Sequence, residues 1–469
     1  MRLTTRRDER GAAMLTAMTV MLVMAALAAV VLANGSRAER GAGRGRNWTQ
    51  ALHVAEAGVE EAVAHLQATN GALPSREADC AATVPAAVQL CSSTNEGDYE
   101  VAVTYLGRNR YEIEATGRVG SAQGLASERK LRVVIAPPPS FLYALFSLTD
   151  VDTKNNNYVE GDIWANGSVS VEQGDTVDGS VNAATGWIFM NNNSTVTGDL
   201  HSGGQNGSGV AIDVSTGAVV EGKVKASSST PACADDPSRV GYQVNVIGSI
   251  TGTVTTWGSK TGGGATGTLF EGVCTEALAT KTMPVFTYDP RNYDPNPYEF
   301  ASVADFQNWL DTAGFEDSLS GTFFVSGSGA IDLTGVTITG DTTIIAYDAA
   351  INANGVESAN SNDKLFILVS FYAPPAGSAC TDGASGNPLD CAVGMKNNFQ
   401  TADNVATLIY APNGPVAFKN NAEFTGAVYS NDIVLKNNQS VVYDARVEQI
   451  VGFGPVTLSR DSWLEVTGE

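Results

Sequence analysis

Histidine and closely spaced cysteine pairs are scarce in this chain of 469 residues. The three histidines are His53, His65 and His201, and the first two fall in a predicted N-terminal helix, so a histidine-assisted nucleophilic site is not expected. No Cys-x-x-Cys spacing is present, so a zinc site is not expected either. The run Gly262-Gly263-Gly264 lacks the lysine of a phosphate-binding loop. These absences predict a protein that is not an enzyme and holds no cofactor or metal.

Positively charged residues are also few. Lys and Arg number 28 against 50 Asp and Glu, giving a formal net charge of −22. The first 46 residues hold eight arginines and three carboxylates, so the remainder carries about −27. An acidic exterior disfavours nucleic acid as a partner and is typical of a soluble, self-repelling surface domain.

The longest apolar stretch runs from Ala12 to Ala33 without a charge. Its 22 residues make a helix of about 33 Å, enough to cross a membrane once. Apolar residues then recur with helical spacing and predict an amphipathic helix from about Asn47 to Gln67. Three alternating segments follow and predict a small antiparallel sheet: Tyr99–Leu106, Arg110–Val119 and Ser127–Ala136. The alternative for the apolar stretch is a secretory signal peptide cut after Ala33.

An arginine-rich leader ending in Gly11, the apolar helix and the AEAG segment Ala55–Gly58 resemble the N-terminus of type IV prepilins, most closely the PilX-like accessory (minor) pilins. The resemblance implies cleavage after Gly11, N-methylation of Ala12 and other pilin subunits as partners. It also implies that the chain resides in the bacterial inner membrane and then in the pilus at the cell surface. Shaft pilins carry Glu at the fifth mature position, where this chain has Thr16. We therefore expect a low-copy place at the pilus tip.

All six cysteines lie beyond the apolar stretch. An even number in an exported chain indicates disulfides, with free buried thiols as the alternative. We predict pairing between sequence neighbours: Cys80 with Cys91, Cys233 with Cys274, and Cys380 with Cys391.

The sequence beyond Pro137-Pro138-Pro139 repeats itself. The segments KNNNYVEGDIWANG (154–167), MNNNSTVTGDLHSGG (190–204) and KNNAEFTGAVYSND (419–432) align almost without gaps. Val159, Val177 and Val196 are 18 and 19 residues apart. This period, with Asn-rich turns, predicts the stacked coils of a β-solenoid, and a β-sandwich is the alternative. The C-terminal half also resembles an uncharacterised β-helical domain often attached to PilX-like N-termini.

The predicted organisation is an α+β pilin-like region followed by an all-β domain. A short helix is expected after the N-cap Ser302. The expected divisions are a leader (1–11), a helix (12–67), a sheet (68–136), a proline-rich linker (137–140) and the solenoid (141–469), with an excursion around 226–318.

If the repeats stack in register, one residue of each coil points outward at the same place. These residues are Trp164, Asn182, His201, Lys225 and Tyr429. Exposed aromatic and polar side chains of this kind, Trp164, His201 and Tyr429 above all, could bind a surface glycan or a host-cell protein. The alternative is that the excursion packs over them.

Two groups of acidic residues were weighed as sites. Asp162 and Asp199 are expected two coils apart, about 10 Å by strand spacing, near the separation used in inverting glycoside hydrolysis. A secreted or membrane-tethered β-helix that processes glycans as a hydrolase or lyase is therefore the alternative function. Asp150, Asp152 and Asn156 lack the spacing of a calcium loop and are interpreted as turn residues.

Overall fold

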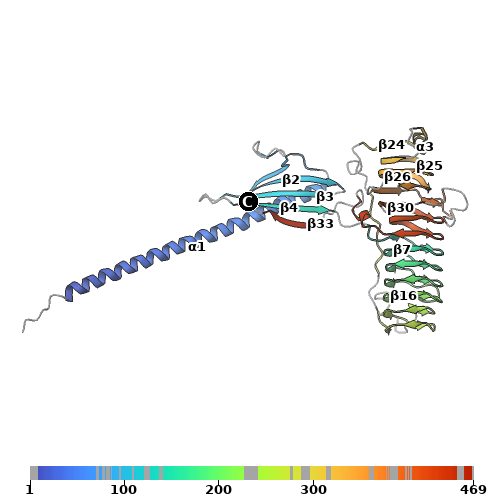
Figure 1. The fold of residues 1–469 in the computed structure, drawn as a ribbon, viewed down its shortest axis with the longest axis horizontal. Coiled ribbons are helices and arrows are strands. Elements are labelled where there is room, and N and C mark those ends of the chain that lie inside the picture. The colour runs from blue at the N-terminus through green and yellow to red at the C-terminus, as the bar shows by residue number, and fades with distance from the viewer. Residues whose placement is uncertain are drawn as a thin grey trace, which may run out of the picture. The chain divides into compact units, whose positions relative to one another are not determined.

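The computed structural model describes residues 9–466, apart from 70–72, 77–79, 81–84, 86, 95–96, 108–109, 121–126, 137–140, 227–240, 275–277, 287–295, 313–317, 359–363, 377, 379, 381–388, 397–398, 400, 402–403 and 451–458. The chain forms two compact units (Figure 1). Unit 1 comprises Met1–Pro138 and Val456–Glu469, and unit 2 comprises Pro139–Pro455. Most of the predicted leader and the whole predicted proline linker lie outside the described residues.

Unit 1 is built around a 60-residue helix, α1 (Glu9–Ala68). The segment Ala17–Gly35 is long and apolar enough to cross a membrane. Its large apolar side chains, from Met18 to Leu32, are each more than half exposed. The first part of the helix therefore has no core of its own within the described chain.

The second part of α1 packs on an antiparallel sheet. Residues facing the sheet are fully buried, among them Ala55, Val59 and Ala62. The contact is close because small residues line it: a Cβ at Gly58 would lie 2.8 Å from Val101 Cγ2. The central strands are β2 (Gly97–Gly107), β3 (Arg110–Val119) and β4 (Ser127–Ala136), so all three predicted strands are confirmed.

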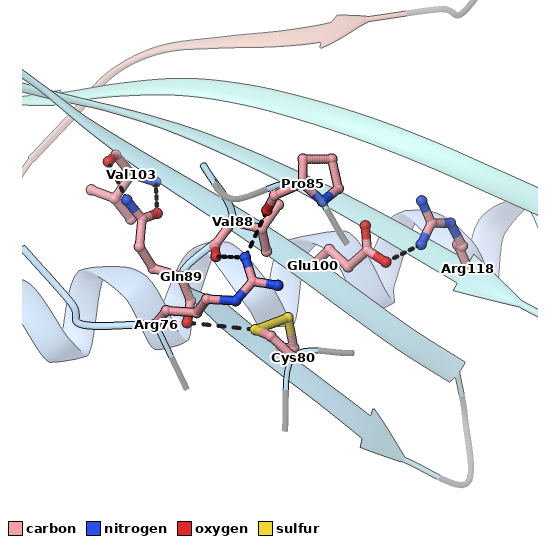
Figure 2. Close-up of a disulfide and its surroundings, with 9 residues drawn as sticks. Arg76, Cys80, Pro85, Val88, Gln89, Glu100, Val103 and Arg118 are labelled. Carbon is pink, nitrogen blue, oxygen red and sulfur yellow. Dashed lines mark hydrogen bonds and ion pairs between the residues drawn. A yellow bond between two sulfur atoms is a disulfide. The ribbon is translucent and has the colours of Figure 1, made fainter. Parts of the chain in front are cut away.

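Two strands at the sheet edges were not predicted. β1 (Leu90–Thr94) pairs with β2, and the disulfide Cys80–Cys91 joins it to the preceding segment. Figure 2 shows how that segment is held: the Arg76 guanidinium donates to the carbonyls of Pro85 and Val88, at 2.9 and 3.4 Å. The Gln89 amide likewise exchanges two hydrogen bonds with the Val103 backbone.

The other edge is β33 (Ser459–Val466), which pairs antiparallel with β4. The prediction that the all-β domain continues to residue 469 is therefore wrong. The chain leaves unit 1 after β4, forms unit 2, and returns to complete the same sheet.

The described part of unit 2 contains 28 strands, and the pairings between them are parallel. Successive strands fall in turn into three ladders, and three consecutive strands make one coil. The first ladder contains β5 (Leu145–Ser147), β8 (Ile163–Ala165), β11 (Val181–Ala183), β14 (Leu200–Ser202), β17 (Val224–Ala226), β20 (Val254–Thr256) and β23 (Leu269–Glu271). The second contains β6 (Val151–Thr153), β9 (Val169–Val171), β12 (Ile188–Met190), β15 (Val210–Val214), β18 (Gln243–Val246) and β21 (Lys260–Thr261). The third contains β7 (Tyr158–Glu160), β10 (Thr176–Asp178), β13 (Thr195–Val196), β16 (Val219–Val220), β19 (Ser249–Ile250) and β22 (Ala265–Thr266).

The second half of unit 2 extends the same stack with longer strands that bend through more than one ladder. Its strands are β24 (Tyr298–Phe300), β25 (Leu319–Asp332), β26 (Thr337–Asn354), β27 (Glu357–Ser358), β28 (Lys364–Ser370), β29 (Val393–Lys396), β30 (Val405–Phe418), β31 (Glu423–Leu435) and β32 (Ser440–Val442). The helix α3 (Val303–Thr312) packs on β25, and the 3-10 helix η2 (Ala445–Gln449) follows β32. The helix predicted after Ser302 is confirmed, and the Ser302 hydroxyl accepts the Asp305 N–H at 3.1 Å.

The order of the coils in space differs from their order in the sequence. The first half stacks away from β5 and ends at β23, whereas the second half runs from β24 back towards β5. The two halves meet where β31 pairs with β5 and β6, and where β32 pairs with β7 (Figure 1). Both connections to unit 1 therefore leave the stack from its middle.

The predicted excursion around 226–318 is largely wrong. Strands β18 to β23 lie within it and continue the three ladders. These strands are only two to four residues long, and the turns between them are rich in Gly, which weakens the repeat in the sequence.

The repeated glycine marks a corner between the third and first ladders. A Cβ at Gly198 would lie 2.4 Å from the Gly179 carbonyl oxygen of the neighbouring coil, and one at Gly179 would lie 2.3 Å from that of Gly161. Only glycine lets the backbones approach this closely. The structure thus places the repeated glycine where the backbones of two coils touch.

The repeated asparagines occupy left-handed turns. Asn156, Asn193 and Asn438 have φ values of 58°, 57° and 58°. Asparagine adopts this conformation more readily than most residues with a side chain, which explains its recurrence at these turns.

A chain of buried hydrogen bonds crosses the junction of the two halves. The Gln439 N–H donates to Asn157 Oδ1 at 2.8 Å, and the Asn157 N–H donates to Asp175 Oδ1 at 2.7 Å. Asp175 is 2% exposed, and burial raises its pKa to about 6. This hydrogen-bonded chain links coils that are 282 residues apart in sequence.

Candidate functional site

One line of side chains runs the full length of the stack on its outside. It is formed by the central residue of each first-ladder strand and by the residues paired with it in the second half. We call it the outer column, and in spatial order it contains Glu299, Phe324, Ile345, Val369, Tyr410, Tyr429, Phe146, Trp164, Asn182, His201, Lys225, Thr255 and Phe270.

The five residues predicted to share one outward face all lie in this column. Trp164 and Tyr429 are 5% and 1% exposed, so the alternative, in which the excursion packs over this face, holds at these two positions. Tyr429 stacks on Phe146 with ring centroids 4.9 Å apart. His201 is half-buried. The middle of the column is thus a second core, separate from the one inside the coils.

The cover over this second core is an extended segment that we call the strap, residues 278–286. Leu278, Met283 and Phe286 contribute its apolar side chains. The region after Cys233 therefore packs over Trp164 and Tyr429, as the alternative predicted. The strap begins after the last strand of the first half and crosses coils of both halves.

Asn166 fixes the strap at the Trp164 coil. Its side-chain amide donates to the Lys281 carbonyl at 2.8 Å and accepts the Lys281 N–H at 2.9 Å. Lys281 Nζ lies 4.2 Å from the centroid of the Trp164 ring. An amide that pairs with both backbone groups of one residue reproduces one step of a β-ladder.

One tyrosine hydroxyl holds the strap further along, and a second holds the segment before β5. The Tyr410 hydroxyl donates to the Pro284 carbonyl at 2.6 Å, and burial raises the pKa of Tyr410 to about 12. The Tyr429 hydroxyl accepts the Tyr143 N–H at 3.0 Å, and burial raises its pKa as well. Both hydroxyls thus stay protonated and act as structural hydrogen-bonding groups.

Beyond the strap, the β24 end of the outer column opens into a pocket of about 380 Å³. It is lined by Glu299, Phe300, Ala301, Phe324, Ser326 and Tyr347. No pattern in the sequence predicted this pocket. Its residues come from β24, β25 and β26, and the signal that could have found it is the register that aligns Glu299 with Phe324 and Ile345.

The acidic residues considered as candidate sites accept hydrogen bonds from backbone N–H groups. Asp162 Oδ1 accepts the Ser180 N–H and Asp199 Oδ1 accepts the Lys223 N–H, each at 2.7 Å and each from the next coil. Asp150 Oδ1 accepts the Ser168 N–H in the same way, at 2.6 Å. In the part of the chain that is described, no group of three His, Cys, Asp or Glu residues is placed to hold a metal ion.

The cysteines follow the predicted pairing as far as they are described. Cys80–Cys91 and Cys380–Cys391 are disulfides. Cys274 is disulfide-bonded, and its predicted partner Cys233 lies outside the described residues. Gly11 and Ala12, the predicted processing site, lie within α1.

Comparison with known proteins gives two matches. Residues 300–450 match the model of a domain of unknown function (DUF7305), which corresponds closely to the second half of unit 2. The crystal structure of the competence-associated pilin ComZ from Thermus thermophilus aligns with 90% of this chain and 97% of its own, at 12% identity and a TM-score of 0.19. A TM-score this low carries no argument about shared structure. No curated protein sequence matches the chain.

Proposed function

We propose that this protein is a non-enzymatic accessory (minor) pilin of a type IV pilus. The observation that carries the proposal is α1, a single helix with an exposed apolar first part and a second part packed on an antiparallel sheet. Exposed apolar surface of this extent needs lipid or other apolar helices around it. The bacterial inner membrane would supply lipid at Ala12–Ala33, and other pilin subunits would supply helices after assembly.

The parallel stack of unit 2 is, in this proposal, a β-solenoid that is displayed at the pilus tip. Supporting this are the three ladders through which the chain passes in turn, and the absence of antiparallel pairs, on which a β-sandwich depends, among the described strands of unit 2. A unit of the size of Pro139–Pro455 is difficult to repeat along a close-packed shaft, and Thr16 cannot provide the carboxylate of a shaft subunit. At the tip the acidic solenoid would meet a surface glycan or a host-cell protein first.

The N-terminus of the mature protein tests the pilin assignment. Mass spectrometry of the protein from its native membrane should find an N-methylated Ala12. A mature chain that starts at Asn34 would instead show an ordinary secretory signal and would overturn the proposal. Immunogold labelling of unit 2 should then mark filament ends. A Thr16→Glu variant should also be found at filament ends if the size of unit 2 decides its position. Uniform labelling of shafts would contradict tip placement.

A further inference from the structure

The pocket at the β24 end of the outer column has the size of a small-molecule site. Its volume of about 380 Å³ falls in the range of pockets that enclose small ligands. Residues 278–286 of the strap are not among its described lining residues.

Aromatic rings form the apolar part of this pocket. Phe324 is 5% exposed and is held in the second core. Tyr347 is half-buried and stacks on Phe371 with ring centroids 5.9 Å apart. The Tyr347 ring, held in this way, lines the pocket as a preformed π surface, and such surfaces attract cations.

The polar part of the pocket is dominated by one carboxylate. Glu299 is exposed and makes no hydrogen bond or ion pair with any residue that the structure describes. Its charge nevertheless reaches Tyr347, since burial and then the Glu299 carboxylate raise the pKa of that hydroxyl. None of the six lining residues is basic, and Ser326 is the other residue with a polar side chain beside Tyr347.

This composition selects among ligand classes. A carboxylate with no basic residue among the described lining residues, in a chain of net charge −22, repels anions. A neutral sugar needs several converging hydrogen-bonding groups for orientation, whereas this pocket offers few. A positive charge on a small apolar body satisfies both the carboxylate and the ring of Tyr347.

We propose that this pocket binds a compact organic cation, an ammonium or quaternary ammonium group on an apolar body, between the Glu299 carboxylate and the ring of Tyr347. The inference is independent of the pilus assignment, because it concerns unit 2 alone and is tested by binding.

The test is calorimetric titration of the full-length protein in detergent with choline. We expect saturable binding that weakens as salt is added. The neutral isostere 3,3-dimethyl-1-butanol, in which carbon replaces the charged nitrogen, should bind about tenfold more weakly or not at all. Glu299→Gln and Tyr347→Ala should each weaken choline binding about tenfold, while Tyr347→Phe, which keeps the ring, should retain it.

The matched control is Glu221→Gln, which removes an exposed carboxylate from the other half of the stack and should leave choline binding unchanged. Thermal unfolding of Glu299→Gln should match that of the natural protein, so lost binding would not reflect lost folding. Absence of choline binding, equal affinity for choline and its isostere, or full binding by both Glu299→Gln and Tyr347→Ala would overturn the proposal. Binding of N-acetylglucosamine in place of choline would do the same.

Discussion

At the scale of single residues, the repeated glycine is the most constrained position of the stack. Gly179 and Gly198 stand at equivalent corners of neighbouring coils, and the missing side chain is what allows the backbones to touch. The neighbouring atom is a carbonyl oxygen held in the ladder, so it has little freedom to move away. The glycine in the apolar-x-Gly-x-apolar motif is therefore a spacing requirement rather than a turn preference.

We predict that Gly198→Ala destabilises unit 2 by about 2–3 kcal/mol, because the new methyl group overlaps the Gly179 carbonyl oxygen. Thermal or urea unfolding of the full chain measures the effect. Gly263→Ala is the matched control, since nothing lies within 4 Å of a Cβ there. Equal stability of the two variants would show that the coils can shift apart at little cost.

At the scale of elements, the sequence predicted those strands whose positions depend on the alternation of apolar residues within the strand. The strands β2, β3 and β4 alternate apolar and other residues and pack one face on α1, so their positions followed from the sequence. The in-register outer column followed from the repeat. β1, with the sequence LCSST, and β33 have no such context, because β33 pairs with a strand from which the whole of unit 2 separates it.

The strap could not be predicted for a related reason. Its contacts join residues such as Lys281 and Asn166, which are 115 positions apart, and its sequence has neither helical nor strand periodicity. The burial of Trp164 and Tyr429 under the strap was equally hard to predict. The register of the strands places a side chain on a face but does not show what covers that face. The pocket at Glu299 was missed because three strands from separate coils build it.

We predict that Asn166→Ala loosens the strap, because both hydrogen bonds to the Lys281 backbone are lost. The free energy of unfolding should fall by about 1–3 kcal/mol. Hydrogen exchange should quicken at 278–286 and remain slow in β8. Asn182→Ala, one coil away in the outer column, is the control and should leave strap exchange unchanged. Unaltered exchange in Asn166→Ala would mean that apolar contacts alone hold the strap.

At the scale of the whole molecule, unit 2 is one continuous stack assembled from two stretches of sequence. The coil that contains β5, β6 and β7 pairs on one side with the end of the second half and on the other with the rest of the first. The region that matches the domain of unknown function covers only one of the two stretches. By itself that region would leave the β31 edge without its partners.

We predict that residues 298–450 expressed alone associate or precipitate, because a bare parallel edge pairs with other chains. Residues 139–455 should be monomeric and fold cooperatively, and size-exclusion chromatography with circular dichroism distinguishes the two outcomes. Adding residues 141–286 in trans should rescue the shorter fragment. A soluble, folded monomer of 298–450 would show that the halves are independent domains.

The mid-stack junction has a consequence for how such proteins can diversify. Because the chain both arrives and departs beside β5, neither outer end of the stack carries a connection to the sheet that holds α1. A duplication or deletion of one coil near β23 alters one arm, and a change near β25 alters the other, without disturbing the anchor. Relatives of different length are then expected to keep the central coils and the pairing of β33 with β4, and to vary in reach as the two arms lengthen or shorten independently.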